Sequence, residues 1–160
     1  MTDAVHRNVS RVVEAGAAIG LDVVPVRFPE GTKTAVEAAN AIGCDVGQIV
    51  KSLIFAVDGE VVLAYVSGAN QLDESKLALA AGGSTCSRVD ADTVRAATGF
   101  PIGGVPPFGH DSALRVFVDP DLMGYDVVWA AAGTWQDVFS LTPQQLVSAC
   151  NGLVVELART

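Results

Sequence analysis

The feature that most constrains this fold is a pair of apolar, β-branched segments separated by a two-residue turn. Residues 49–57 and 60–67 each have the length and composition of a strand, and Asp58-Gly59 lies between them. That dipeptide favours a type I′ turn, whose twist matches the twist of two paired strands. The two segments are therefore predicted to form a β-hairpin, and its antiparallel pairing favours a mixed sheet over an all-parallel one.

Capping signals predict helices on both sides of the hairpin. Thr34 and Glu37 are spaced as a capping box, and Gly43 follows where the helix would stop. Three further helices are predicted: one capped by Thr2 or Asp3 and ended at Gly20, one capped by Asp73, and one over residues 90–98. A last helix is predicted to begin after Thr142, and further strands over residues 21–28, 114–118, 127–131 and 153–157.

The composition indicates one globular domain over residues 1–160. Half of the residues are hydrophobic, which excludes disorder, and a chain of 160 residues can bury roughly two-thirds of its unfolded surface. We find no repeat, low-complexity segment or linker. The expected fold class is α+β, with a mixed, largely antiparallel sheet surrounded by helices.

Charge and hydropathy exclude several classes of function. A net charge of -8 argues against binding long stretches of duplex nucleic acid such as DNA, where Lys and Arg supply most of the affinity, although a small local basic site is compatible with it. No apolar run approaches the ~18 residues of a membrane span, and the N-terminus has no signal-peptide pattern. We therefore expect a cytoplasmic protein without a membrane partner.

Cysteine spacing gives no sign of a metal or a disulfide. Cys44, Cys86 and Cys150 are widely separated, form no Cys-x-x-Cys pair and have no nearby histidine that would complete a zinc site. We interpret them as reduced thiols in or near the core. No metal and no organic cofactor are expected.

Lys51 is the only charged residue in the first strand of the predicted hairpin. By alternation it shares a face with Ile49, Leu53 and Phe55, and that face is apolar. Its ammonium must therefore either reach solvent along its own alkyl chain or meet an anion or a carbonyl oxygen in a pocket. The first alternative makes Lys51 an ordinary surface lysine, and the second makes it a candidate site residue.

A glycine- and proline-rich loop over residues 103–109 is the second candidate. Gly103 and Gly104 permit positive φ and close approach to a ligand, while Pro106 and Pro107 fix the path of the chain. Such a loop can present backbone amides to a developing oxyanion, but it can equally be a rigid turn. It does not have the pattern of a phosphate-binding P-loop.

Obvious acid, base or nucleophile constellations are missing from the sequence. His110, Asp111 and Ser112 invite comparison with a catalytic triad, but three consecutive side chains cannot easily converge on one point, and we interpret them as loop residues. Paired carboxylates are also absent. An enzyme built on this chain would depend on positioning, on backbone donors and on a group of its substrate.

Five segments together resemble a known family. Residues 34–39, 49–55, 103–109, 119–122 and 128–133 occur in the order seen in the YbaK/ProX family of aminoacyl-tRNA editing domains. The resemblance extends from about Thr32 to the C-terminus. It implies a mixed, partly barrel-like sheet wrapped by helices, and a trans-acting hydrolase that cleaves the ester between a wrong amino acid and the 3′ end of a tRNA, often the tRNA for proline.

The resemblance also implies roles for individual residues. Lys51 would hold the terminal phosphate or the substrate carbonyl. The backbone of Gly103 and Pro107 would bind and polarise the aminoacyl carbonyl, with Gly104 beside them. Hydrolysis would use water aided by a hydroxyl group of the terminal adenosine, which agrees with the missing general base. No cofactor is implied. The further residues predicted to bind substrate are Phe28, Pro106, Phe108, Gly109 and Ala131.

The amino acid removed is not fixed by the resemblance. Some cysteine-specific members carry a serine in the segment that holds Ala131 here, and the histidine that alanine-specific members place in that region is also absent. A pocket lined by small apolar residues would suit alanine or cysteine better than proline. Prolyl-tRNA synthetase is a candidate partner beside the tRNA acceptor end. The alternatives are a non-catalytic module that binds an aminoacyl-tRNA end or a synthetase, and a hydrolase of small esters or amides.

Overall fold

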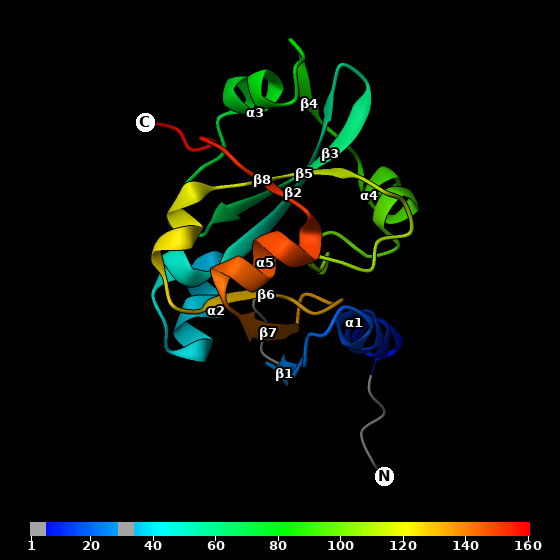
Figure 1. Ribbon diagram of the computed structural model, residues 1–160, viewed down its shortest axis with the longest axis vertical. Coiled ribbons are helices and arrows are strands. Elements are labelled where there is room, and N and C mark those ends of the chain that lie inside the picture. Colours follow the sequence, from blue (N-terminus) through cyan, green and yellow to red (C-terminus); the bar gives the residue numbers. More distant parts are fainter. Residues whose placement is uncertain (1–5, 29–33) are drawn as a thin grey trace.

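The computed structural model describes residues 6–28 and 34–160, and a long β-hairpin lies at the centre of the fold (Figure 1). Its strands, β2 (Val50–Val57) and β3 (Glu60–Ser67), pair along their whole length. Asp58 and Gly59 both have positive φ, 50° and 87°, as a type I′ turn requires. The predicted hairpin is therefore confirmed, with its first strand beginning one residue later than expected.

Two sheets are built around this hairpin (Figure 1). The larger has the order β4-β2-β3-β5-β8, in which β2 pairs antiparallel with its neighbours, whereas β5 is parallel to β3 and to β8. The smaller sheet, β1-β7-β6, is antiparallel, and an isolated parallel bridge from Ile49 to Trp129 links it to the larger one. The remaining strands are β1 (Val26–Arg27), β4 (Cys86–Arg88), β5 (Arg115–Val118), β6 (Val128–Ala131), β7 (Asp137–Leu141) and β8 (Leu153–Val154).

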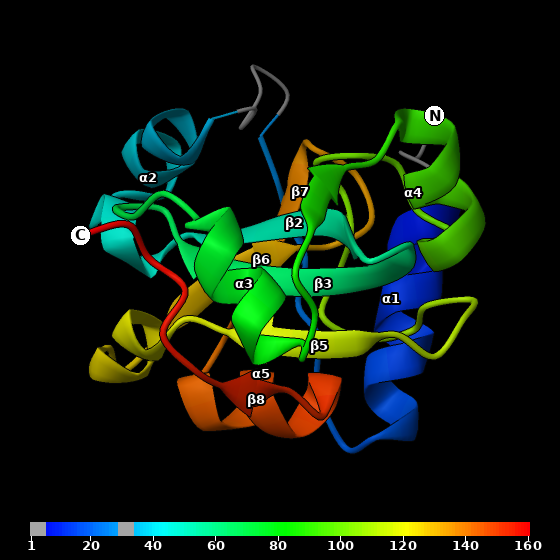
Figure 2. The same ribbon diagram turned by 90° about the horizontal axis from the view of Figure 1, so that it is seen from above.

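This arrangement confirms the α+β class with a mixed, largely antiparallel sheet. The described strands form two open sheets that meet at β2 and β6, and they do not close into a barrel. Helices α1 and α4 lie at one end of the sheets and α2 at the other (Figure 2). The helices are α1 (Arg7–Ala18), α2 (Ala35–Ile42), α3 (Glu74–Ala80), α4 (Ala91–Thr98) and α5 (Pro143–Cys150).

Most helix ends lie where the capping signals predicted them. Thr34 and Glu37 form both bonds of the capping box at the start of α2, and Gly43 ends that helix in the left-handed conformation. Helix α1 begins at Arg7 with His6 as its N-cap, while the predicted caps Thr2 and Asp3 lie outside the described residues. None of the described helices is long and apolar enough to span a bilayer.

The strand predictions failed at the margins of the fold. Of the predicted strand 21–28 only Val26–Arg27 pairs, because Pro25 offers no amide donor and the partner β7 is short. Strand β7 was not predicted, and neither was the three-residue β4. Such short strands depend on the partner that they meet in the folded chain, and the sequence pattern alone does not reveal it.

The core lies on both faces of β3. Its residues from Val62 to Val66 have no exposed surface, so one face packs toward α5 and the smaller sheet and the other toward α3. Tyr65 is the largest of these residues and carries its hydroxyl group into the core. A buried hydroxyl needs a hydrogen-bond partner, and the partner it finds belongs to the loop at the candidate site.

Candidate functional site

A pocket of about 450 Å³ lies along the first half of β2, which pairs with β3. Strand β4 pairs with β2 only from Phe55 to Val57, and the isolated bridge from Ile49 to Trp129 lies just before β2, so among the described residues no second strand pairs with β2 at Lys51. Lys51, Gly103 and Ala131 all line this pocket, together with residues 34–36 at the start of α2. Three predicted site residues from distant parts of the chain thus meet in one cavity.

Lys51 is half-buried and meets a backbone carbonyl at the pocket. Its Nζ donates to the carbonyl oxygen of Asn70, which follows the other strand of the hairpin. Removal from water lowers the pKa of Lys51, and the nearby Asp119 carboxylate opposes that effect. Of the two alternatives for this lysine, the pocket alternative therefore describes its position.

Asp119 organises the groups around Lys51 without lining the pocket. Its carboxylate is 1% exposed, and it accepts hydrogen bonds from the Ser67 amide at 3.1 Å and from Asn70 Nδ2 at 2.8 Å. It also accepts from the Asp121 amide at 2.9 Å. This buried carboxylate holds Asn70 in place, and Asn70 in turn holds the Lys51 ammonium.

Three side chains hold the loop of residues 103–109 against the sheet. Ser52 Oγ donates to the Val105 carbonyl at 2.8 Å, and the Tyr65 hydroxyl donates to the Pro106 carbonyl at 2.8 Å. His110 Nε2 lies 2.6 Å from the same Pro106 oxygen. His110 thus serves the loop and is not part of a triad, as the sequence predicted. Burial lowers the pKa of this histidine.

The two adjacent glycines of the loop have different environments. Gly103 is exposed, has a φ of 83° and makes no amide hydrogen bond with a described residue. Gly104 is buried, and its amide donates to the Pro101 carbonyl at 2.9 Å. A Cβ on Gly104 would lie 2.8 Å from the Gly133 carbonyl oxygen. Gly103 can therefore offer its amide to a ligand, whereas Gly104 is required for close backbone packing.

The other predicted site residues do not line the pocket. Pro106 and Pro107 belong to the buried part of the loop, and Phe108 packs edge-on against Phe139 with ring centroids 5.8 Å apart. Gly109 is exposed beside α1. Phe28 is half-buried, and its amide donates to the Gln136 carbonyl at 2.8 Å. These residues shape or support the site from outside the cavity.

Sequence reasoning missed several residues of the pocket and its support. Val36 and Ile102, 58% and 56% exposed, form an apolar rim at the pocket. Asn70 and Asp119 each follow one of two adjacent parallel strands, β3 and β5. Because the carboxyl ends of adjacent parallel strands meet at one edge of a sheet, this placement was a signal that could have found both residues.

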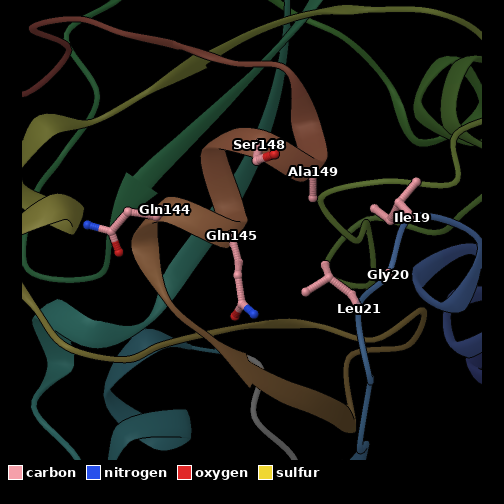
Figure 3. Close-up of a pocket in the computed structure, with 7 residues that line it drawn as sticks. All are labelled: Ile19, Gly20, Leu21, Gln144, Gln145, Ser148 and Ala149. Atoms are coloured by element: carbon pink, nitrogen blue, oxygen red, sulfur yellow. The ribbon is translucent and has the colours of Figure 1, made fainter.

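A separate pocket lies between the end of α1 and α5 (Figure 3). It has a volume of about 330 Å³, and Gln144, Gln145 and Ser148 supply its polar groups. No predicted site residue and no charged side chain lines it. Among the described residues, no group of three or more His, Cys, Asp or Glu side chains is placed to hold a metal ion.

Comparison with known proteins assigns the family. The family profile of the aminoacyl-tRNA editing domain matches residues 29–149, and the chain belongs to that family. A solved structure of a candidate trans-editing enzyme for prolyl-tRNA synthetase is 40% identical, with a TM-score of 0.92 over 98% of this chain and 100% of the other.

Curated relatives are consistent with this assignment. The proline–tRNA ligase of Nitratidesulfovibrio vulgaris is 35% identical over 121 residues, which is 76% of this chain and 20% of the ligase. The chain thus spans about a fifth of that relative's length. The candidate Cys-tRNA(Pro)/Cys-tRNA(Cys) deacylase EbsC of Enterococcus faecalis is 28% identical over 81% of this chain and 80% of that protein.

Proposed function

We propose that this chain is a trans-acting editing hydrolase, which cleaves the ester bond between a wrong amino acid and the 3′ end of a tRNA. The observation that carries the proposal is the meeting of the Lys51 ammonium and the unbonded Gly103 amide in one largely apolar pocket. Family membership supports the reaction class, and the names of the relatives support the tRNA for proline as the nucleic acid. Prolyl-tRNA synthetase is then the enzyme whose errors the chain corrects.

A charged group and a backbone donor have different roles in the pocket. Lys51 binds the terminal phosphate or the carbonyl oxygen of the substrate. A half-buried ammonium attracts such an oxygen more strongly than an ammonium in bulk water does, because the surroundings screen the charge less. The Gly103 amide donates to the carbonyl oxygen as negative charge develops on it. The rigid loop fixes that amide before the substrate arrives, so little reorganisation is needed during the reaction.

The attacking group is water, and the substrate assists it. The described residues that line the pocket include no carboxylate and no histidine that could act as a general base. In place of a general base from the protein, a hydroxyl group of the terminal adenosine can orient the attacking water by a hydrogen bond. Water adds to the ester carbonyl carbon, and the bond between that carbon and the ribose oxygen then breaks. The ribose oxygen takes up a proton from the water and stays on the tRNA as a hydroxyl group, and the free amino acid is released.

The size of the pocket lining favours a small amino acid. Ala35, Leu53 and Ala131 supply apolar surface, and the lining contains no acidic side chain for a basic substrate. A synthetase pocket discriminates against one missing methylene by only about 1–3 kcal/mol, so a second site that destroys the smaller product is needed. Alanine or cysteine on the tRNA for proline fits this requirement.

The exposed apolar rim gives the terminal nucleotide a place to lie. Val36 comes from α2 and Ile102 from the turn before Gly103, and both lie at the pocket. Apolar surface beside a pocket favours contact with the face of a base, because that contact removes both from water. The terminal adenine would then lie over the rim, with its ribose directed toward Lys51.

The test is the release of amino acid from tRNAs charged with alanine, cysteine, serine or proline. We expect rapid loss of one wrong amino acid with the wild type, and a loss of at least 100-fold in rate with Lys51→Ala, the usual order for one transition-state contact. Lys76→Ala is the matched control, because Lys76 Nζ also donates to a backbone carbonyl, that of Ala158, away from the pocket.

The outcomes separate the three candidate functions. Turnover that depends on Lys51 and not on Lys76 supports the editing hydrolase. Binding of charged tRNA that protects the ester from loss would instead identify a non-catalytic module. Equal turnover of aminoacyl esters that lack the tRNA body would favour a small-molecule hydrolase.

A further inference from the structure

A second, basic cavity lies beside the candidate site. It has a volume of about 570 Å³ and is formed between the start of α1 and the end of α4. Arg7 and Arg11 of α1 and Arg95 of α4 line it, and no carboxylate is among its lining residues. Three of the ten basic residues of a chain with net charge -8 therefore gather at one cavity.

Two of these arginines have no counter-ion among the described residues. Arg7 and Arg95 are exposed, and neither makes an ion pair or a side-chain hydrogen bond with a described residue. Arg11 is fixed instead: its guanidinium donates to the Gly99 carbonyl at 2.9 Å, meets Asp111 at 3.2 Å and lies over the Phe100 ring. Arg11 is thus an ordered cation, and Arg7 and Arg95 are left to bind an external anion.

The basic cavity and the candidate site share one turn of the chain. Pro101 lines the basic cavity, Gly103 lines the candidate site, and the bond from the Gly104 amide to the Pro101 carbonyl closes the turn between them. Ile102 also lines the candidate site, so the two cavities are lined by consecutive residues of the chain.

The packing beneath the two cavities is rigid. Asn8, which lines the basic cavity, donates from Nδ2 to the Gly133 carbonyl at 3.1 Å. Gly133 also lies against Gly104, where a Cβ would come within 2.8 Å of the Gly133 oxygen. The start of α1 is thereby fixed to the glycine loop, and the arginines keep a constant position relative to Gly103.

We infer that Arg7, Arg11 and Arg95 bind the phosphates of the tRNA acceptor strand next to its aminoacylated end. The inference rests on the proposed function, since it places the esterified nucleotide at Gly103 and the preceding phosphates in the basic cavity. Arginine suits this task because its planar guanidinium donates two parallel hydrogen bonds to a phosphate. A chain with a net charge of -8 then holds the tRNA end at a cavity where basic side chains gather.

The test is binding of a fluorescent RNA hairpin that carries an acceptor stem and a 3′ CCA end, measured by anisotropy from 50 to about 250 mM KCl. Each lost phosphate contact reduces the slope of log K against log salt by about 0.7 for single-stranded RNA. The variant Arg7→Gln with Arg95→Gln is therefore expected to lower the slope by about 1.4 and the affinity about tenfold near 0.15 M salt. Arg88→Gln is the control, because Arg88 is also exposed and without an ion pair to a described residue, but lies on β4.

Two results would overturn this inference: an unchanged slope in the double variant, or the same change with Arg88→Gln, which would mean a general effect of charge. Absence of measurable binding by the wild type would overturn it as well. Deacylation of the same hairpin charged with alanine or cysteine distinguishes the two proposals. The double variant should raise KM and leave kcat unchanged, whereas binding without any hydrolysis by the wild type removes the proposed function and leaves the phosphate surface standing.

Discussion

The loop that carries Gly103 depends on one buried carbonyl oxygen with two partners. The Pro106 oxygen meets both the Tyr65 hydroxyl at 2.8 Å and His110 Nε2 at 2.6 Å. Tyr65→Phe removes one partner and leaves no new donor unpaired. We therefore expect it to cost about 1 kcal/mol, the net value of one hydrogen bond, and to lower Tm by about 2–4 °C.

Removing both partners has a larger effect than the sum of the single changes. In the double variant Tyr65→Phe with His110→Ala, the Pro106 carbonyl keeps neither partner, and a buried unpaired group costs about 1–3 kcal/mol. The coupling free energy between the two changes should accordingly be about 1–2 kcal/mol. The packing lost in His110→Ala does not contribute to this coupling free energy, because the loss occurs both in the single and in the double variant of the double-mutant cycle.

Urea unfolding of the four proteins measures this coupling, and deacylation rates measure its effect on the site. The double variant should also lose turnover, since the Gly103 amide would no longer be held in one position. Additive free energies of unfolding, within about 0.5 kcal/mol, would refute the shared-carbonyl argument. So would full activity in a double variant with the expected loss of stability, which would show that the loop needs no anchoring.

Two further predictions concern stability. Gly104→Ala places a Cβ 2.8 Å from the Gly133 carbonyl oxygen and should cost about 1–3 kcal/mol, whereas Gly124→Ala, with open space around it, should cost much less; equal urea midpoints would contradict this. The pKa of His110 is lower in the folded chain than in the unfolded chain, so the unfolded state binds more protons as pH falls. The stability of the wild type should therefore decrease below about pH 6.5 more than that of His110→Gln, and parallel curves of unfolding free energy against pH would contradict this.

Much of the secondary structure was determined by signals that lie within four residues of one another. Asp58-Gly59 specifies its turn because both residues tolerate positive φ, and Thr34 with Glu37 satisfies the free amides at the start of α2. These signals were correct because both partners of each hydrogen bond are neighbours in the sequence. The strands β4 and β7 had no such signal, and their existence depends on distant partners.

The candidate site, too, was predictable only where local sequence signals sufficed. The sequence identified Lys51 as a charge in an apolar strand and the glycine loop as a possible donor, both from local chemistry. Only the tertiary structure decided that, among the described residues, β2 pairs with no second strand at Lys51, that Gly103 and not Gly104 has a free amide, and that Asp119 holds the lysine's neighbour. Each of these facts depends on what a group meets after folding.

The basic cavity was determined by tertiary structure alone. Arg11 bonds to Gly99 across 88 residues of sequence, and α4 brings Arg95 to the same cavity. Helix α1 has only one more basic than acidic residue, α4 has one of each, and the whole chain is acidic, so composition did not reveal the cavity. The sequence thus determined the local backbone, where interacting groups are neighbours, and folding alone determined which side chains from distant segments share one surface.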